Sequence, residues 1–127
     1  MLGRRDPQRD ATTRIDLRST CLHGAFLSNA NLSDADLAAA HLDGADLRVA
    51  DVDHANLRGA DLEGAHLSDA DLASADVRHA DLAGANLRHA HLSFADLRGA
   101  NLGGTQLDGA DFRVADLEGA DFGGADL

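Results

Sequence analysis

Hydrophobic residues recur in this chain at every fifth position. From Leu17 to Leu127 the central residue of each repeat is Leu, Val or Phe, so that all 23 centres are apolar. Two residues before the centre, 20 of the 23 positions are Ala; directly before it, 13 are Asp and four are Asn. One unit therefore reads as a small residue, a polar residue, a Leu and two variable residues.

A period of five fits neither regular secondary structure. On an α-helix, five residues advance by about 500°, so that successive centres step roughly 140° around the axis and form no apolar stripe. On a continuous strand, an odd period places alternate centres on opposite faces. The chain must therefore turn within each repeat while Leu and Ala point inward. A chain that turns repeatedly in the same sense is a solenoid.

The glycines indicate how many repeats make one coil. The second residue after the centre is glycine at six positions spaced by 20 residues, namely Gly24, Gly44, Gly64, Gly84, Gly104 and Gly124. A spacing of 15 scatters the same glycines. Because glycine accepts a positive φ without a Cβ penalty, this column predicts one repeated corner. Four repeats of five residues are therefore predicted to form one coil.

The repeat resembles the A(D/N)LXX motif of the pentapeptide repeat family, and it covers about nine-tenths of the chain. The resemblance implies an all-β fold, a right-handed quadrilateral parallel β-helix, here with nearly six coils. The general preference for right-handed crossovers between parallel strands agrees with this handedness. One repeat buries too little apolar surface to offset the entropy lost by its backbone, so the coils must stack to be stable.

The repeat frame divides the chain into two parts. Residues 15–127 are predicted to form the β-helix, and residues 1–14 an N-terminal tail or cap with a net charge of +2. A basic arm that grips an anionic partner is the alternative interpretation of this tail. In the first repeats, Cys21 and Phe26 occupy the usual Asp or Asn position. Such departures are typical of capping repeats, and an exposed Phe26 that contacts a partner is the alternative.

Composition narrows the location of the protein. A single Cys excludes an intramolecular disulfide and suits a reducing compartment. No apolar run approaches the length of a membrane span, and the first ten residues lack the apolar region of a signal peptide. We therefore expect a cytoplasmic protein that does not contact the membrane.

No sequence motif points to catalysis. The chain has no lysine, no nucleophile elbow, no phosphate-binding glycine loop and no zinc-type spacing of Cys and His. His89 and His91 lie two residues apart but fall on different faces of the predicted coil, and the other histidines are dispersed. Short turns cannot build the concave pocket that substrates need. We expect neither enzyme activity nor a metal or cofactor.

Acidic residues dominate the predicted solenoid and gather on two of its faces. Residues 15–127 contain 20 acidic side chains and seven Arg, a net charge of −13, which the tail reduces to −11. The face centred on residues 22, 42, 62, 82, 102 and 122 has no Arg and carries Asp43, Asp61, Glu63, Asp81 and Asp121. The opposite face carries Asp34, Asp51, Asp53, Asp71 and Asp111 against Arg113 alone.

These two acidic faces are the candidate binding surfaces. Their field would attract a protein partner with a basic surface and disfavour direct binding of nucleic acid. A structural explanation is compatible with this one, because Asp and Asn readily hydrogen-bond the backbone at turns. The sequence thus favours a protein interaction or scaffold module.

The family resemblance implies an alternative. Some pentapeptide repeat proteins mimic duplex DNA, bind type II topoisomerases such as DNA gyrase and protect them from quinolone-type inhibitors. The acidity fits this role, although a rod about 28 Å long would span only about 8 base pairs.

The last coil is expected to mediate self-association. Its apolar centres are Phe112, Leu117, Phe122 and Leu127. An uncovered last coil would leave open strand edges and an apolar layer, which natural proteins seldom leave bare. The resemblance also implies dimerisation through the C-terminal end, as is frequent in the family. We therefore predict a homodimer that packs end to end through these four residues.

Overall fold

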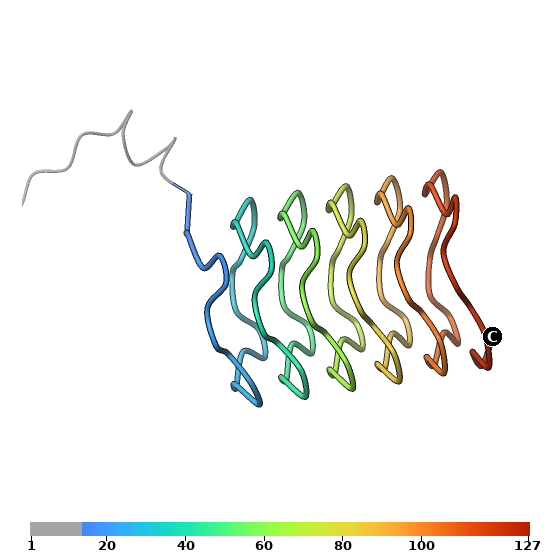
Figure 1. The fold of residues 1–127 in the computed structure, drawn as a ribbon, viewed down its shortest axis with the longest axis horizontal. Helices are drawn as coiled ribbons and strands as arrows, with labels where there is room; N and C mark the ends of the chain where they lie inside the picture. The colour runs from blue at the N-terminus through green and yellow to red at the C-terminus, as the bar shows by residue number, and fades with distance from the viewer. Residues whose placement is uncertain (1–13) are drawn as a thin grey trace, which may run out of the picture.

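Residues 14–127 form a solenoid of coils stacked along one axis in the computed structural model, which describes these residues (Figure 1). The predicted tail or cap therefore lies outside the described residues, except for Arg14. Parallel bridges join each residue before a centre to the residue twenty positions later, from Asp16 with Asp36 to Gln106 with Asp126. Each contact is a single bridge rather than an extended strand. No helix in the described region is long and apolar enough to cross a membrane.

Backbone hydrogen bonds between successive coils hold the stack together. The Leu42 N–H donates to Asp61 O at 2.7 Å, and the Gly44 N–H donates to Glu63 O at 2.9 Å, both in the following coil. The His41 N–H donates in the opposite direction, to Thr20 O at 2.9 Å. These three bonds recur along the chain. Because the partners belong to neighbouring coils, each repeat depends on stacking to satisfy its backbone.

The core is a continuous column of Leu and Ala. From Ala35 to Leu102, every centre and every residue two positions before it is at most 2% exposed, as the inward orientation predicts. Thr105 is the one buried polar residue among those described, and its hydroxyl donates to Leu102 O at 2.8 Å. This internal hydrogen bond lets a hydroxyl occupy a position that Ala otherwise fills. Towards both ends of the stack the centres become half-buried.

The backbone conformation at the corners contradicts the expectation that the glycine column marks one special corner. The second residue after each centre has a left-handed φ of 55° to 73° at every repeat from Ser19 to Gly124, in ten glycines and twelve other residues. The glycine column therefore does not mark a corner of special conformation. The N–H of each corner residue followed by another coil bonds that coil, as Val49 N does with Ser68 O at 3.1 Å. Stacking therefore favours the left-handed backbone whatever the residue type.

Candidate protein-binding surfaces

The Asp and Asn residues directly before the centres stabilise the turns. In sixteen repeats their Oδ1 accepts a hydrogen bond from the N–H two residues later, at 2.9 to 3.4 Å. The side-chain oxygen satisfies a backbone donor that the ladder leaves free. Either a carboxylate or an amide can do this, so the turn requires the oxygen and not the charge.

This role divides the ten predicted acidic residues into two groups. Six use Oδ1 for the turn: Asp51, Asp61, Asp71, Asp81, Asp111 and Asp121. The other four lie one or two residues after a centre and do not form this turn hydrogen bond: Asp34, Asp43, Asp53 and Glu63. The turns therefore account for an oxygen at the first six positions, but not for the negative charge at any of the ten. Charge on the second group is free to serve binding.

On the Arg-free face, three carboxylates come together. Asp61, Glu63 and Asp81 each offer an oxygen that lies within 4.8 Å of the others. The Asn101 amide donates to Asp81 Oδ1 at 3.3 Å, but no guanidinium approaches any of the three within the described residues. Like charges stacked on successive coils without a counter-ion raise the local negative potential, which attracts cationic groups. Asp43, at the earlier end of this face, contacts the His23 ring.

On the opposite face, the side chains of Asp51 and Asp53 interact. Asp53 Oδ1 is buried without a hydrogen-bond donor. A hydrogen bond between the two side chains raises the pKa of Asp51. Hydrogen bonds from Asp51 and then from Ser33 lower the pKa of Asp53 to about 2, and His54 Nδ1 lies 3.1 Å from its Oδ2. The two carboxylates therefore differ in proton affinity, and Asp51 is the one that binds a proton more readily.

The remaining predicted residues of that face do not form one cluster. Arg113 binds Asp111 through both its Nε and Nη2, with Nη2 2.6 Å from Oδ2. This contact lowers the pKa of Asp111 to about 2. Asp34 occupies a left-handed corner with φ 62°, and Asp71 uses Oδ1 for its turn. Arg113, the guanidinium that the sequence placed on this face, is thus engaged with a single carboxylate.

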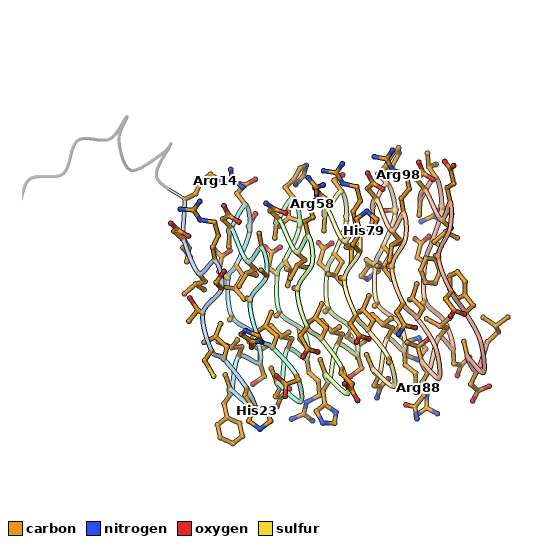
Figure 2. The ribbon with its side chains drawn as sticks, in the orientation of Figure 1. Arg14, His23, Arg58, His79, Arg88 and Arg98 are labelled. Carbon is orange, nitrogen blue, oxygen red and sulfur yellow. The ribbon has the colours of Figure 1, made fainter. Side chains whose placement is uncertain are left out.

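The seven arginines of residues 15–127 fall into two classes according to the residue two positions earlier. Where that residue is Asp, the guanidinium binds it in a bidentate manner: Arg18, Arg48, Arg78, Arg98 and Arg113. Where it is Asn, in the repeats of Arg58 and Arg88, no carboxylate lies within ion-pair distance in the described part of the chain. Figure 2 shows these two side chains at opposite margins of the rod.

The predicted end residues form a half-open layer. The rings of Phe112 and Phe122 meet edge to face, with centroids 6.2 Å apart and planes at 80°. Leu117 is half-buried beside them, and Leu127 is 88% exposed. At the other end of the rod, Phe26 is 93% exposed. Both ends thus present apolar side chains to solvent.

Sequence reasoning missed one apolar pair on the side of the rod. Phe94 and Val114 are 64% and 73% exposed, and each is the second residue after a centre. They lie twenty residues apart, so they occupy the same corner on successive coils. The period of twenty residues is enough to predict that these two side chains are neighbours. The distribution of charged residues over the faces does not reveal this apolar pair.

Comparison with known families matches most of the chain. A family model described as pentapeptide repeats matches in eight copies, over residues 13–48, 30–69, 50–89, 65–104 and 95–127. No curated protein matched the sequence. The match spans the described solenoid almost completely.

Solved structures show the same architecture. Rfr23, a pentapeptide repeat protein from the cyanobacterium Cyanothece 51142, is 35% identical with a TM-score of 0.71, over 72% of this chain and 63% of that protein. This chain thus spans less than two thirds of the cyanobacterial protein. A pentapeptide repeat protein from the Arabidopsis thaliana thylakoid lumen is 31% identical with a TM-score of 0.57, over 94% and 72% of the two chains.

A more distant structure shares the fold alone. QnrB1, a plasmid-mediated fluoroquinolone resistance protein, is 17% identical with a TM-score of 0.52, over 88% of this chain and 66% of that protein.

Proposed function

Because the chain belongs to the pentapeptide repeat family, we propose that it is a non-enzymatic module that binds a protein partner with a basic surface. The observation that carries this proposal is the Arg-free face, where Asp61, Glu63 and Asp81 approach within 4.8 Å of one another. Asp43 and Glu63 also have no part in the turns. A regular rod that places such residues on one line offers an extended complementary surface.

We infer the finer geometry from the repeat. Bridges twenty residues apart and a left-handed corner every five residues support four sides per coil, and nearly six coils. The right-handed sense follows the family resemblance and the usual handedness of parallel crossovers. In this geometry the Arg-free face is one side of a square rod. Its glycine corners lack side chains that would hold a partner away.

A charge-matched pair of variants tests the proposal. The first combines Asp43→Arg, Glu63→Arg and Asp81→Asn, because Asn preserves the oxygen that accepts from Ala83 N. The control combines Asp69→Arg, Asp108→Arg and Asp126→Asn, which changes the net charge equally on another face. Affinity capture from host lysate, at low and high salt, should recover a partner with the control and lose it with the first variant. Equal loss with both would indicate non-specific attraction and contradict a defined face.

A second candidate is mimicry of duplex DNA towards a type II topoisomerase. The stacked carboxylates and the fold shared with QnrB1 favour it. Purified DNA gyrase is the direct probe. Mimicry predicts binding that weakens steeply as salt rises and that competes with duplex DNA, with relief of quinolone inhibition. Salt-insensitive binding, or the absence of competition with DNA, would contradict it.

We also propose that a second copy covers the C-terminal layer. Phe112, Leu117 and Phe122 are half-buried, whereas their counterparts one coil earlier are at most 1% exposed. The substitution Phe122→Asp should then give a monomer, measured by light scattering. An unchanged mass for this variant, or a monomeric unmodified protein, would exclude the dimer.

A further inference from the structure

Two large apolar side chains stand next to each other on one corner of the rod. Phe94 has φ 61° and Val114 has φ 59°, and both side chains are mostly exposed. The Phe94 N–H donates to Arg113 O at 3.0 Å, which fixes the two corners on neighbouring coils. At the usual spacing of about 4.8 Å between adjacent strands, their side chains form one apolar ridge.

The residue types at this corner are unfavourable for folding. A left-handed backbone suits Gly and, to a lesser degree, Asn and Asp, while a bulky or β-branched residue is strained there. Most corners of this chain have Gly or a short polar residue. Exposure of Phe94 and Val114 to water adds a second cost, and neither side chain contributes to the core. Folding alone therefore does not account for these residues, and strained positions of this kind often serve function.

Charged groups surround the ridge. Asp96 and Asp116 follow its two residues by two positions, and Arg98 lies between them, bound to Asp96 at 2.6 Å and 3.6 Å from Asp116. On the other side, Arg113 is paired with Asp111. Arg78 also lies 3.6 Å from Asp96, but it has its own partner, Asp76. With Asp76 and the exposed Glu118, five carboxylates stand against three guanidiniums, a surplus of two negative charges. The rim of the ridge is therefore acidic.

We propose that Phe94 and Val114 form the centre of a docking ridge for a protein segment that presents apolar side chains flanked by Lys or Arg. An apolar centre within a polar rim is the usual anatomy of a protein interface, and aromatic residues are frequent at its hot spots. Excess carboxylates at the rim select a basic partner. This inference rests on the proposed protein-binding role but centres it on two apolar corner residues of the face opposite the Arg-free face.

The test uses a phage-displayed library of short random peptides, selected on the full-length protein. Enriched peptides should combine apolar and basic residues. The double variant Phe94→Asn, Val114→Asn should weaken their binding at least tenfold, measured by calorimetry, while its melting temperature stays equal or rises because Asn tolerates the corner. Val49→Asn is the matched control, since Val49 is also exposed at a left-handed corner, between Asn29 and Asp69. This control should bind like the unmodified protein.

Any other result contradicts the proposed docking role of the ridge. Failure to enrich any peptide, enrichment of apolar peptides with acidic residues, or undiminished binding by the double variant would each refute it. Peptides that instead lose affinity for the Asp43, Glu63 and Asp81 variant would support the acidic face while refuting the ridge. If the double variant lowers the molecular mass in light scattering, the occupant is a second copy of the chain, and the basic partner proposed here is wrong.

Discussion

The guanidinium of Arg78 binds the carboxylate of Asp76 in a bidentate manner, with Nε 2.8 Å from Oδ1 and Nη2 2.7 Å from Oδ2. The same guanidinium lies 3.6 Å from Asp96 on the next coil, and Arg18 and Arg98 make the same contact with Asp36 and Asp116. The hydrogen bonds from Arg78 lower the pKa of Asp76. The repeats of Arg58 and Arg88 have Asn in place of this Asp and therefore lack the ion pair. Introducing the carboxylate there measures what the ion pair contributes to stability.

The substitution Asn86→Asp should create such a pair with Arg88. The neighbours of Asn86 on adjacent coils are His66 and Gln106, so a new carboxylate meets no like charge there. The carboxylate keeps the oxygen that accepts from Arg88 N at 3.1 Å. An exposed bidentate pair is worth up to about 1 kcal/mol, and we expect the free energy of unfolding to rise by that order in urea titrations at low salt.

Asn56→Asp is the matched control for Asn86→Asp. Asn56 lies between Asp36 and Asp76, and its amide donates to Asp36 Oδ1 at 3.3 Å. A carboxylate at this position would lose that hydrogen bond and repel both neighbours, which offsets the gain from Arg58. We expect no increase in the free energy of unfolding. An equal gain for both variants would show that stacked carboxylates repel each other less than we infer.

Substitutions at two corner glycines distinguish the destabilising effect of backbone strain from that of steric contact. At Gly64, with φ +65°, a Cβ would meet no atom within 4 Å. At Gly99, with φ +70°, a Cβ would lie 2.6 Å from His79 Nδ1. Gly64→Ala should therefore lower the free energy of unfolding by about 1 kcal/mol through the left-handed backbone alone. Gly99→Ala should cost more, because the imidazole must also move.

A double-mutant cycle checks this assignment. In a protein that has His79→Ala, the cost of Gly99→Ala should fall to that of Gly64→Ala, and the difference measures the contact with the ring. Denaturant titrations of the four variants provide the values. If Gly99→Ala costs the same with and without the imidazole, then His79 does not pack on Gly99 in solution.

The architecture could be predicted from the sequence because every repeat must bury the same two positions. Leu62 and Ala60 are fully buried for the same reason as their counterparts in other coils, so a period of five in apolar residues and of twenty in glycines defined the register. Corners such as Val49 could not be identified in this way. Their left-handed backbone is favoured by hydrogen bonds to the next coil, so that a bulky residue can stand where most corners have Gly or a short polar residue.

The candidate surfaces were only partly predictable. The sequence placed Asp61, Glu63 and Asp81 on one face, and the structure brings their oxygens together. It did not separate Asp81, whose Oδ1 serves a turn, from Glu63, which has no such role, because both are simply acidic. Composition by face likewise could not reveal that the pKa of Asp51 is raised, because this shift depends on the exact placement of Asp53.

Asp71 tests whether the turns need charge or only an oxygen. Its Oδ1 accepts a hydrogen bond from Ala73 N at 3.0 Å. Asp71→Asn keeps this acceptor and removes a charge near Asp51, so that the free energy of unfolding at neutral pH should stay equal or rise. Asp71→Ala leaves the N–H without its partner and should cost about 0.5–1.5 kcal/mol. Thermal and urea denaturation compare the two variants; equal losses would mean that the side-chain hydrogen bond contributes nothing.

The pair of Asp51 and Asp53 predicts a stability difference that depends on pH. Folding raises the pKa of Asp51, so its folded form binds the proton more tightly than the unfolded chain does. The stability that this proton provides is fully present below the unfolded pKa of about 3.9, and it is lost as the pH rises through the folded pKa. Asp51→Asn keeps the oxygen for Asp53 N and supplies a permanent neutral donor to Asp53 Oδ1.

This variant should therefore be more stable than the unmodified protein at pH 7, where Asp51 is ionised beside Asp53. The difference should shrink as the pH falls and disappear near pH 3, where the unmodified Asp51 is protonated. Asp71→Asn is the control, because it also removes one charge from the same face but leaves the pair intact. Urea titrations between pH 3 and pH 7 measure both variants. A gain that does not change with pH, or an equal pH dependence in the control, would show that Asp51 and Asp53 do not share a proton.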